Sequence, residues 1–320
     1  MKKIFDKNDY TILGKKYKVI IDTDPGVDDA ACLAYAFFDE HIEIKLLTSV
    51  VGNTSLAKTT RNLLHLMDKF GVNVPVAKGA NKAMTRESIN AEFIHQEEGL
   101  GGYIPDSNTF SQLLDIDAID AMYKVLSEGD GDIIPIVLGP QTNIGHLLQK
   151  YPDVIDKIPQ IVFMGGSPFG NPNYPDHISF NISSDPEAFD IVLKSKIPLV
   201  MVPSDVGRRK AHLSEEFVNS LAKINDAGKL LAQMYSKYWE PNYPDKRVAT
   251  NDSLALFALV YPKMFKFERV SVTVDLEHAP GKTFVDFDGK GNTLIMVDVD
   301  RDAFLDLLVS DLKNIKVVKD

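Results

Sequence analysis

Apolar runs with the length of buried strands alternate along the chain with segments whose apolar residues recur at helical spacing. Helical segments follow or separate the predicted strands, an alternation typical of a mostly parallel sheet with helices on both faces. The predicted strands are residues 18–22, 42–50, 133–138, 160–164 and 198–202, and the predicted helices are residues 27–38, 55–70, 142–150, 186–194 and 214–221.

The pattern changes after Arg269, where runs of alternating apolar and polar residues are joined by glycine-containing turns. Such runs, at 270–276, 282–288 and 292–299, predict antiparallel additions to the sheet, and a last helix is expected over 301–312. The predicted fold is therefore α/β, a single domain with a mostly parallel open sheet flanked by helices and antiparallel C-terminal additions. We expect residues 1–17 to form an N-terminal extension and residues 18–320 the catalytic domain.

The composition excludes several classes of protein but does not indicate a function. A net charge of -10 disfavours nucleic acid as a partner, because proteins that bind the phosphate backbone usually present a basic face. No segment has the roughly 20 apolar residues of a membrane span, and the charged N-terminus lacks the apolar core of a signal peptide. The single cysteine, Cys32, rules out an intrachain disulfide. We therefore predict a cytoplasmic protein without a membrane partner.

Acidic residues and glycine-containing turns follow several of the predicted strands. The segment Asp22-Thr-Asp24-Pro-Gly-Val-Asp28-Asp29 follows the first strand, and turns at Gly139 and at 165–166 follow later ones. Ligands of open α/β sheets bind at the carboxyl ends of the strands. We therefore expect these segments to meet at one edge of the sheet.

Four carboxylates within eight residues would repel one another unless a cation or a proton compensates them. Only oxygen ligands are present in the segment, which favours Ca²⁺ or Mg²⁺ over Zn²⁺. An EF-hand is a poor fit, because Val27 and Leu33 stand where that loop needs glycine and glutamate. Two alternatives stay open: acids that only cap the helix, and a phosphatase that uses Asp22 as nucleophile and Asp24 as acid/base.

Blocks spread over most of the chain resemble the nucleoside hydrolase family, the inosine-uridine-preferring nucleoside N-ribohydrolases. The resemblance runs from about residue 18 to residue 312 and begins with DTDPGVDDA at 22–30. It continues, in the order found in the family, with the blocks at 51–54 with 59–62, 95–102, 138–143, 164–166, 180–182, 185–188 and 251–252. One departure lies in the third block, where Gln96 stands in place of the usual glycine.

This resemblance implies a calcium-dependent enzyme that hydrolyses the N-glycosidic bond of ribonucleosides to ribose and free base. Asp24 is expected to bind Ca²⁺ and to act as the general base that deprotonates the attacking water. Further metal ligands would be Asp29, Asp252 and the backbone carbonyl of Leu138, with Asp22 supporting the metal site. A metal lowers the pKa of a bound water, and an adjacent carboxylate can take the proton and stabilise an oxocarbenium-like state.

For the substrate, the resemblance implies a ring of polar side chains around the ribose. His95 is expected to lie beside the nucleobase and to take part in catalysis there. The implied partner is a small-molecule nucleoside, and family members are usually dimers or tetramers, so we expect a homodimer or homotetramer. The expected substrate contacts are Asp28, Asn53, Asn173, Phe180 and Asn181.

Two further positions depart from the family pattern. Ser179 replaces the usual ribose-binding glutamate, and Asn251 replaces a histidine that assists the leaving base in many members. An amide cannot serve as an acid, so activation of the leaving base would have to come from another source. The candidates are His95, a tyrosine such as Tyr235, Tyr238 or Tyr243, and aromatic stacking that raises the basicity of a purine. These departures motivate an alternative function, a nucleoside- or ribose-binding protein with impaired catalysis.

Overall fold

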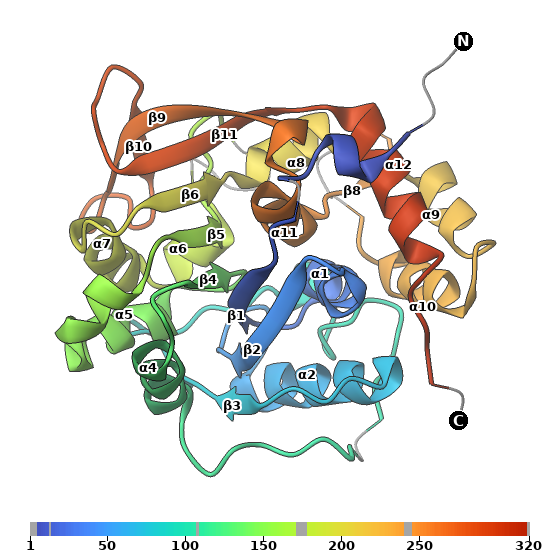
Figure 1. Cartoon of the computed structure of the whole chain (residues 1–320), viewed down its shortest axis with the longest axis horizontal. Helices are drawn as coiled ribbons and strands as arrows, with labels where there is room; N and C mark the ends of the chain where they lie inside the picture. The colour runs from blue at the N-terminus through green and yellow to red at the C-terminus, as the bar shows by residue number, and fades with distance from the viewer. Residues whose placement is uncertain (1–4, 13, 107–108, 171–177, 240–244, 319–320) are drawn as a thin grey trace.

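The computed structural model describes residues 5–12, 14–106, 109–170, 178–239 and 245–318. Its main feature is a nine-stranded sheet with the order β10-β9-β11-β6-β5-β4-β1-β2-β3 (Figure 1). Seven neighbouring strands, from β3 to β11, are parallel, whereas β9 and β10 run antiparallel to their neighbours. The strands are β1 Tyr17–Thr23, β2 Ile42–Ser49, β3 Val76–Lys78, β4 Ile133–Val137, β5 Ile161–Met164, β6 Leu199–Val202, β9 Phe265–Val274, β10 Thr283–Asp286 and β11 Thr293–Val299. A separate two-stranded sheet pairs β7 Leu213–Ser214 with β8 Arg247–Val248.

Helices cover both faces of the sheet, so its strands are buried on both sides. Along β1, Val19 and Ile21 pack into one core and Ile20 into the other. One face carries α4 Ala118–Glu128, α5 Thr142–Lys150 and α7 Pro186–Lys194. The other carries α1 Val27–Phe38, α2 Leu56–Phe70, α8 Ser204–Lys210, α9 Glu215–Leu221, α10 Asp226–Tyr235, α11 Asn251–Val260 and α12 Arg301–Leu312. Two short helices, α3 Glu92–His95 and α6 Phe180–Ser184, lie near the carboxyl ends of the strands.

The predicted fold class is confirmed, with one refinement at the C-terminus. The antiparallel additions are β9 and β10, but β11 pairs parallel with β6 and extends the central sheet. Alternation shows that a strand has two different faces, and it does not tell in which direction the strand pairs. Helix α8 was not predicted, because its sequence SDVGRRK has too few apolar residues to show a helical pattern, and α10 was not predicted either. No helix in the described part of the chain has the length and apolarity needed to cross a membrane.

Candidate active site

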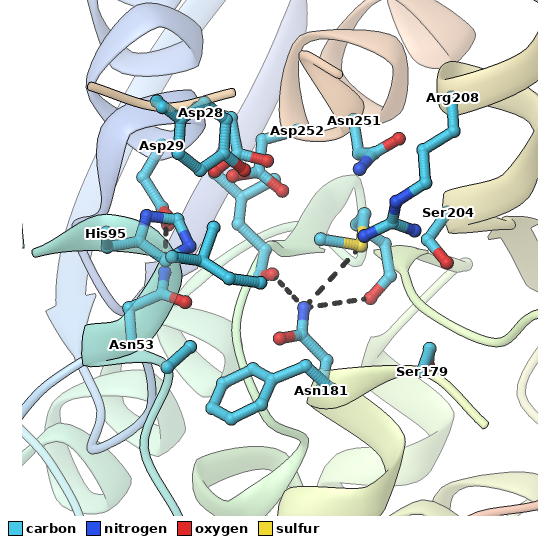
Figure 2. Close-up of a pocket in the computed structure, with 16 residues that line it drawn as sticks. Asp28, Asp29, Asn53, His95, Ser179, Asn181, Ser204, Arg208, Asn251 and Asp252 are labelled. Carbon is cyan, nitrogen blue, oxygen red and sulfur yellow. Dashed lines mark hydrogen bonds between the residues drawn. The ribbon is translucent and has the colours of Figure 1, made fainter. Parts of the chain in front are cut away.

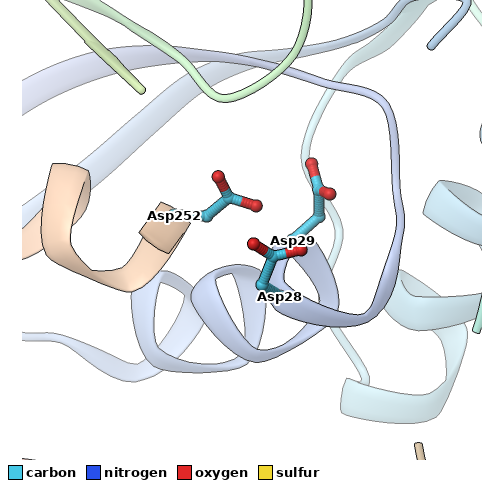
Figure 3. Close-up of side chains that lie close together, drawn as sticks. All are labelled: Asp28, Asp29 and Asp252. Carbon is cyan, nitrogen blue, oxygen red and sulfur yellow. The ribbon is translucent and has the colours of Figure 1, made fainter. Parts of the chain in front are cut away.

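Three carboxylates from two helix starts converge at the carboxyl ends of the strands. Asp28 and Asp29 lie in the first turn of α1, which begins directly after β1, and Asp252 lies in the first turn of α11. One oxygen of each lies within 4.8 Å of the others, and all three side chains are buried (Figure 3). The N-terminal end of a helix carries a partial positive charge and favours a carboxylate. The partial charges of two helix ends are too small to offset three buried carboxylates.

Asp29 is held in place by three hydrogen bonds. Thr23 Oγ1 donates to its Oδ1 at 2.5 Å, and the backbone N–H of Gly26 donates to its Oδ2 at 3.0 Å. The Asn53 side chain also donates to Asp29 Oδ2, at 3.1 Å. The orientation of this carboxylate is therefore fixed before any ligand binds.

Asp24 lies in a slot between two glycine-containing turns. Its Oδ2 accepts the backbone N–H of Asn53 at 2.8 Å. A Cβ at Gly52 would stand 2.0 Å from Asp24 Oδ2, and one at Gly139 would stand 2.6 Å from Asp24 Oδ1. Both positions therefore need glycine, because a larger residue would displace the carboxylate. Asp24 Oδ1 is buried and accepts no hydrogen bond from any described residue.

The electrostatics of the cluster favour a bound cation. Burial, followed by repulsion from Asp29, raises the pKa of Asp28 to about 8, and the same two causes raise the pKa of Asp24 well above its usual value. Burial, followed by repulsion from Asp28, also raises the pKa of Asp252, whose Oδ1 accepts no hydrogen bond within the described chain. Buried carboxylates of this kind need protons or a cation. An all-oxygen donor set fits a hard divalent cation.

Asp22 is held by a hydrogen-bond network with Thr48 and Asn143. Its Oδ1 accepts Thr48 Oγ1 at 2.6 Å and Asn143 Nδ2 at 2.7 Å. Burial raises its pKa to about 7. Asp22 does not line the pocket.

The carbonyl of Leu138 and the side chain of Asn181 are neighbours on the pocket wall. Asn181 Nδ2 donates to the Leu138 carbonyl oxygen at 2.5 Å and to that of Met164 at 3.3 Å (Figure 2). A carbonyl oxygen has two lone pairs, so Leu138 keeps one acceptor site for a further partner.

Most of the residues predicted for the site surround one pocket. They are Asp28, Asp29, Asn53, His95, Leu138, Phe180, Asn181 and Asp252. Asp22 and Asp24 do not line the pocket, although Asp24 contributes to the same cluster of charge. Asn173 lies outside the described residues. The structure adds Met164, Ser204 and Arg208 to the wall. Ser204 comes directly after β6, and Arg208 lies one turn later on α8. Because ligands of open α/β sheets bind at the carboxyl ends of the strands, this segment would have been a candidate for the site had α8 been predicted.

His95 lies at the end of α3, where its surroundings keep the imidazole ring neutral. Its Nδ1 accepts the backbone N–H of Val27 at 3.1 Å, and its ring packs against Tyr238 with centroids 4.8 Å apart. Burial, followed by the charge of Arg208, lowers its pKa to about 3. With Nδ1 accepting, the proton resides on Nε2, which leaves one N–H donor for a ligand.

We expect His95 to stay neutral, with its proton on Nε2, from pH 5 to pH 8. Imidazole nitrogen shifts measured by ¹H–¹⁵N NMR should show the resonances of this tautomer unchanged across that range. The exposed His278 serves as a reference, since it lies on the surface. A His95 ring that titrates near pH 6.5 would contradict the neutral assignment and restore it as a general acid.

The residue after His95 has an unusual backbone conformation. Gln96 has φ 66°, in the region that favours glycine. This explains why a glycine is usual at this place in the resembling block.

Two of the three departures from the family pattern, Ser179 and Asn251, line the pocket. Ser179 caps α6 and its Oγ accepts the backbone N–H of Gly166 at 2.7 Å. Asn251 begins α11, and its Oδ1 is buried without a hydrogen bond from the described residues. A Cβ at Gly207 would stand 2.0 Å from this oxygen. Gly207 therefore makes room for the Asn251 side chain.

Comparison with known proteins shows the family of this chain. The family model described as inosine-uridine preferring nucleoside hydrolase matches residues 19–306. The non-specific ribonucleoside hydrolase RihC of Salmonella enteritidis is 36% identical over 293 residues, which cover 89% of this chain and 94% of that protein. The purine-preferring ribonucleoside hydrolase from Gardnerella vaginalis superposes with a TM-score of 0.84 at 29% identity, covering 93% of this chain and 98% of the other. The plant nucleoside hydrolase PpNRh1 gives a TM-score of 0.85 at 26% identity over 93% and 99% of the two chains.

The chain belongs to the inosine-uridine preferring nucleoside hydrolase family. It is a hydrolase of N-glycosyl compounds, and its substrate is a small nucleoside. The phosphatase alternative is therefore wrong.

Proposed function

We propose that this enzyme hydrolyses ribonucleosides to ribose and free base in a calcium-dependent reaction with Asp24 as general base. The observation that carries the proposal is the buried cluster of Asp28, Asp29 and Asp252, which lies on the wall of a pocket with amide side chains. Asp24, Asp29, Asp252 and the Leu138 carbonyl would hold the cation. When bound, Ca²⁺ would neutralise these carboxylates and make a coordinated water more acidic.

In this proposal the other steps of the reaction are carried out by residues of the chain. Asp24 takes the proton of the attacking water, since its Oδ1 accepts no hydrogen bond from the described residues while Asn53 holds Oδ2. The carboxylate charge also stabilises the positive charge that develops on the ribosyl group. Asp28 and Asn181 hold ribose hydroxyls. Asn53, Asn173 and Phe180 are further substrate contacts, and Asp22 supports the metal site through the sheet edge.

The nucleobase would lie against His95 and Tyr238, whose rings form one wall. His95 Nε2–H can donate a hydrogen bond to a base nitrogen or oxygen and so hold the leaving base. It remains neutral in this role, so it orients the base and does not protonate it. The proposal covers purine and pyrimidine nucleosides, because the relative with 36% identity is described as non-specific.

We further propose a cytoplasmic homodimer or homotetramer. The lone cysteine, Cys32, is buried and free, which suits a reducing compartment. Large apolar side chains are exposed at Phe93 (66%), Ile104 (78%) and Phe110 (90%), which suits a surface between subunits. Residues 1–17 are proposed as an extension to a catalytic domain over 18–320.

A substrate panel tests the function. Purified enzyme with Ca²⁺ should release free base from at least one of inosine, uridine, cytidine and adenosine, and far more slowly from the matching 2′-deoxynucleoside. The deoxy substrate lacks one hydroxyl that Asp28, Asn181 or the cation would bind, which should cost about 10- to 100-fold in rate. Binding of nucleosides without turnover of any would favour the binding-protein alternative instead.

A further inference from the structure

Asn251 gives the pocket a hydrogen-bond donor that cannot act as an acid. It stands where many family members have a histidine, is 2% exposed and lines the pocket. Its Oδ1 lies against Gly207, since a Cβ there would stand 2.0 Å from this oxygen, and its Nδ2 points into the pocket (Figure 2). A substrate can therefore accept a hydrogen bond from Asn251, but it cannot take a proton from the amide.

The two rings proposed to contact the base do not supply a proton either. His95 Nδ1 accepts the Val27 N–H at 3.1 Å, so the imidazole is neutral and its one proton is on Nε2. The Tyr238 hydroxyl donates a hydrogen bond to the side chain of Asp28, so its proton is already bound by a carboxylate. A base beside these rings meets aromatic faces and a neutral N–H donor.

The other titratable side chains of the described lining are three carboxylates and Arg208. In the proposed function Asp29 and Asp252 bind the cation and Asp28 binds a ribose hydroxyl, so all three are ionised. A guanidinium keeps its proton at neutral pH. Among the described residues of the lining, none can therefore protonate a leaving base, wherever the base lies in the pocket.

The charge of the site favours a substrate with a positive charge. Four buried carboxylates act on one another there, namely those of Asp24, Asp28, Asp29 and Asp252. A divalent cation and the Arg208 guanidinium, whose charge acts on Asp28, together offset all but one of these negative charges. Water and salt screen a buried charge only weakly, so a cationic base beside C1′ would be attracted to the site.

We propose that the enzyme hydrolyses N-ribosylpyridinium compounds, cationic ribonucleosides whose positive charge is on the ring joined to C1′, and prefers them to neutral nucleosides. This inference rests on the proposed function and specifies its substrate class. Water adds its oxygen to C1′, gives one proton to Asp24 and keeps the other in the new hydroxyl group. The electron pair of the N-glycosidic bond moves to the ring nitrogen, so the base leaves as a neutral pyridine without taking a proton. The proton on Asp24 then passes to solvent, and the other product is ribose.

The first test compares nicotinamide riboside with inosine on the calcium-loaded enzyme, with the released bases measured by chromatography. A positioned general acid accelerates a reaction by about 100- to 10,000-fold. The departure of hypoxanthine needs that help, whereas the departure of nicotinamide does not. We therefore expect kcat/KM to be at least about 100-fold higher for nicotinamide riboside. A value equal to or below that for inosine would overturn the inference, because it would show that a neutral base receives a proton in this site.

A binding experiment separates the effect of charge from the reactivity of the substrate. The probes are 3-(β-D-ribofuranosyl)pyridine and its N-methylpyridinium derivative, in which a carbon joins the ring to C1′ and no N-glycosidic bond can break. Isothermal titration calorimetry on the calcium-loaded enzyme should give a Kd at least about tenfold lower for the cation. Equal affinities for the two probes would overturn the attraction of the site for a cationic base.

The variant N251H returns an imidazole to the position before Asp252. We expect kcat/KM for inosine to rise at least about tenfold, and kcat/KM for nicotinamide riboside to stay within about threefold, because only the neutral base gains from an acid. N251A is the matched control, since it fits the space beside Gly207, adds no acid and should raise neither value. A folded N251H enzyme that keeps the wild-type preference would overturn the inference. If its melting temperature shows that N251H does not fold, the rates and affinities of the wild type decide.

The outcomes distinguish this inference from the function on which it rests. Release of base from inosine or uridine without cleavage of nicotinamide riboside would overturn the inference and leave the proposed function standing. Failure to release base from any ribonucleoside, cationic or neutral, would overturn the proposed function and the inference with it.

Discussion

The variant Asp24→Asn is expected to lose at least about 1,000-fold in kcat/KM for the best nucleoside of the panel, because it removes both a general base and a metal ligand. The amide keeps the size of the side chain and can still accept the Asn53 N–H through its oxygen. The slot between Gly52 and Gly139 should therefore remain filled. The loss should appear in kcat, while the melting temperature measured in EDTA changes little.

Asp205→Asn is the matched control for this experiment. Asp205 is buried, and its pKa is raised by burial as in the cluster, but it binds the Phe169 N–H and does not line the pocket. Asparagine can keep that hydrogen bond, so kcat/KM should stay within about tenfold of the wild type. If Asp24→Asn retains more than about a tenth of the wild-type rate, Asp24 is not the base.

Removal of the cation is expected to stop turnover and to weaken the fold, by an amount that grows with pH. At a hundredfold excess over its Kd, Ca²⁺ should contribute about 2.7 kcal/mol to the free energy of unfolding. Melting temperatures in EDTA and in Ca²⁺ at pH 6, 7 and 8 measure this contribution. Asp252→Asn is the companion variant, and its melting temperature should respond to Ca²⁺ much less.

The sign of the pH dependence follows from the raised pKa values. Asp28 has a pKa of about 8 in the metal-free fold, against 3.8 for an ordinary aspartate. Between these values the folded state binds a proton that the unfolded chain has released, so the free energy of unfolding falls as pH rises. Ca²⁺ competes with those protons and binds more tightly at higher pH. The gap between the two melting curves should therefore widen from pH 6 to pH 8.

Two results would contradict this account of the cluster. One is an equal melting-temperature gap at pH 6 and pH 8, which would mean that protons and cation do not compete for the same carboxylates. The other is full activity of EDTA-treated enzyme, which would mean that the carboxylates work without a cation. If activity returns with Mg²⁺ but not with Ca²⁺, the proposed metal site stands but its ion is Mg²⁺.

The sequence by itself determined the fold class and the acidic segment at the carboxyl end of β1. Alternating strands and helices are a local property of the chain, and the strand-end rule then places the segment 22–29 at the ligand-binding edge. Helix α1 was predicted with its observed bounds, Val27–Phe38. The acids of this segment are recognisable as a ligand site because four carboxylates around a Pro-Gly turn repel one another unless a cation or protons offset their charge.

Only the tertiary structure decided those features of the site that depend on contacts between residues far apart in the sequence. The protonation of His95 depends on the Val27 N–H, which comes from a residue 68 positions away. The meeting of Asp252 with Asp28 and Asp29 depends on the packing of α11 against α1. In the sequence, Arg208 is only one of several charged residues in a short polar segment. Only the fold shows that this guanidinium is buried against the pocket while its neighbour Arg209 is exposed, because burial depends on which face of α8 packs inward.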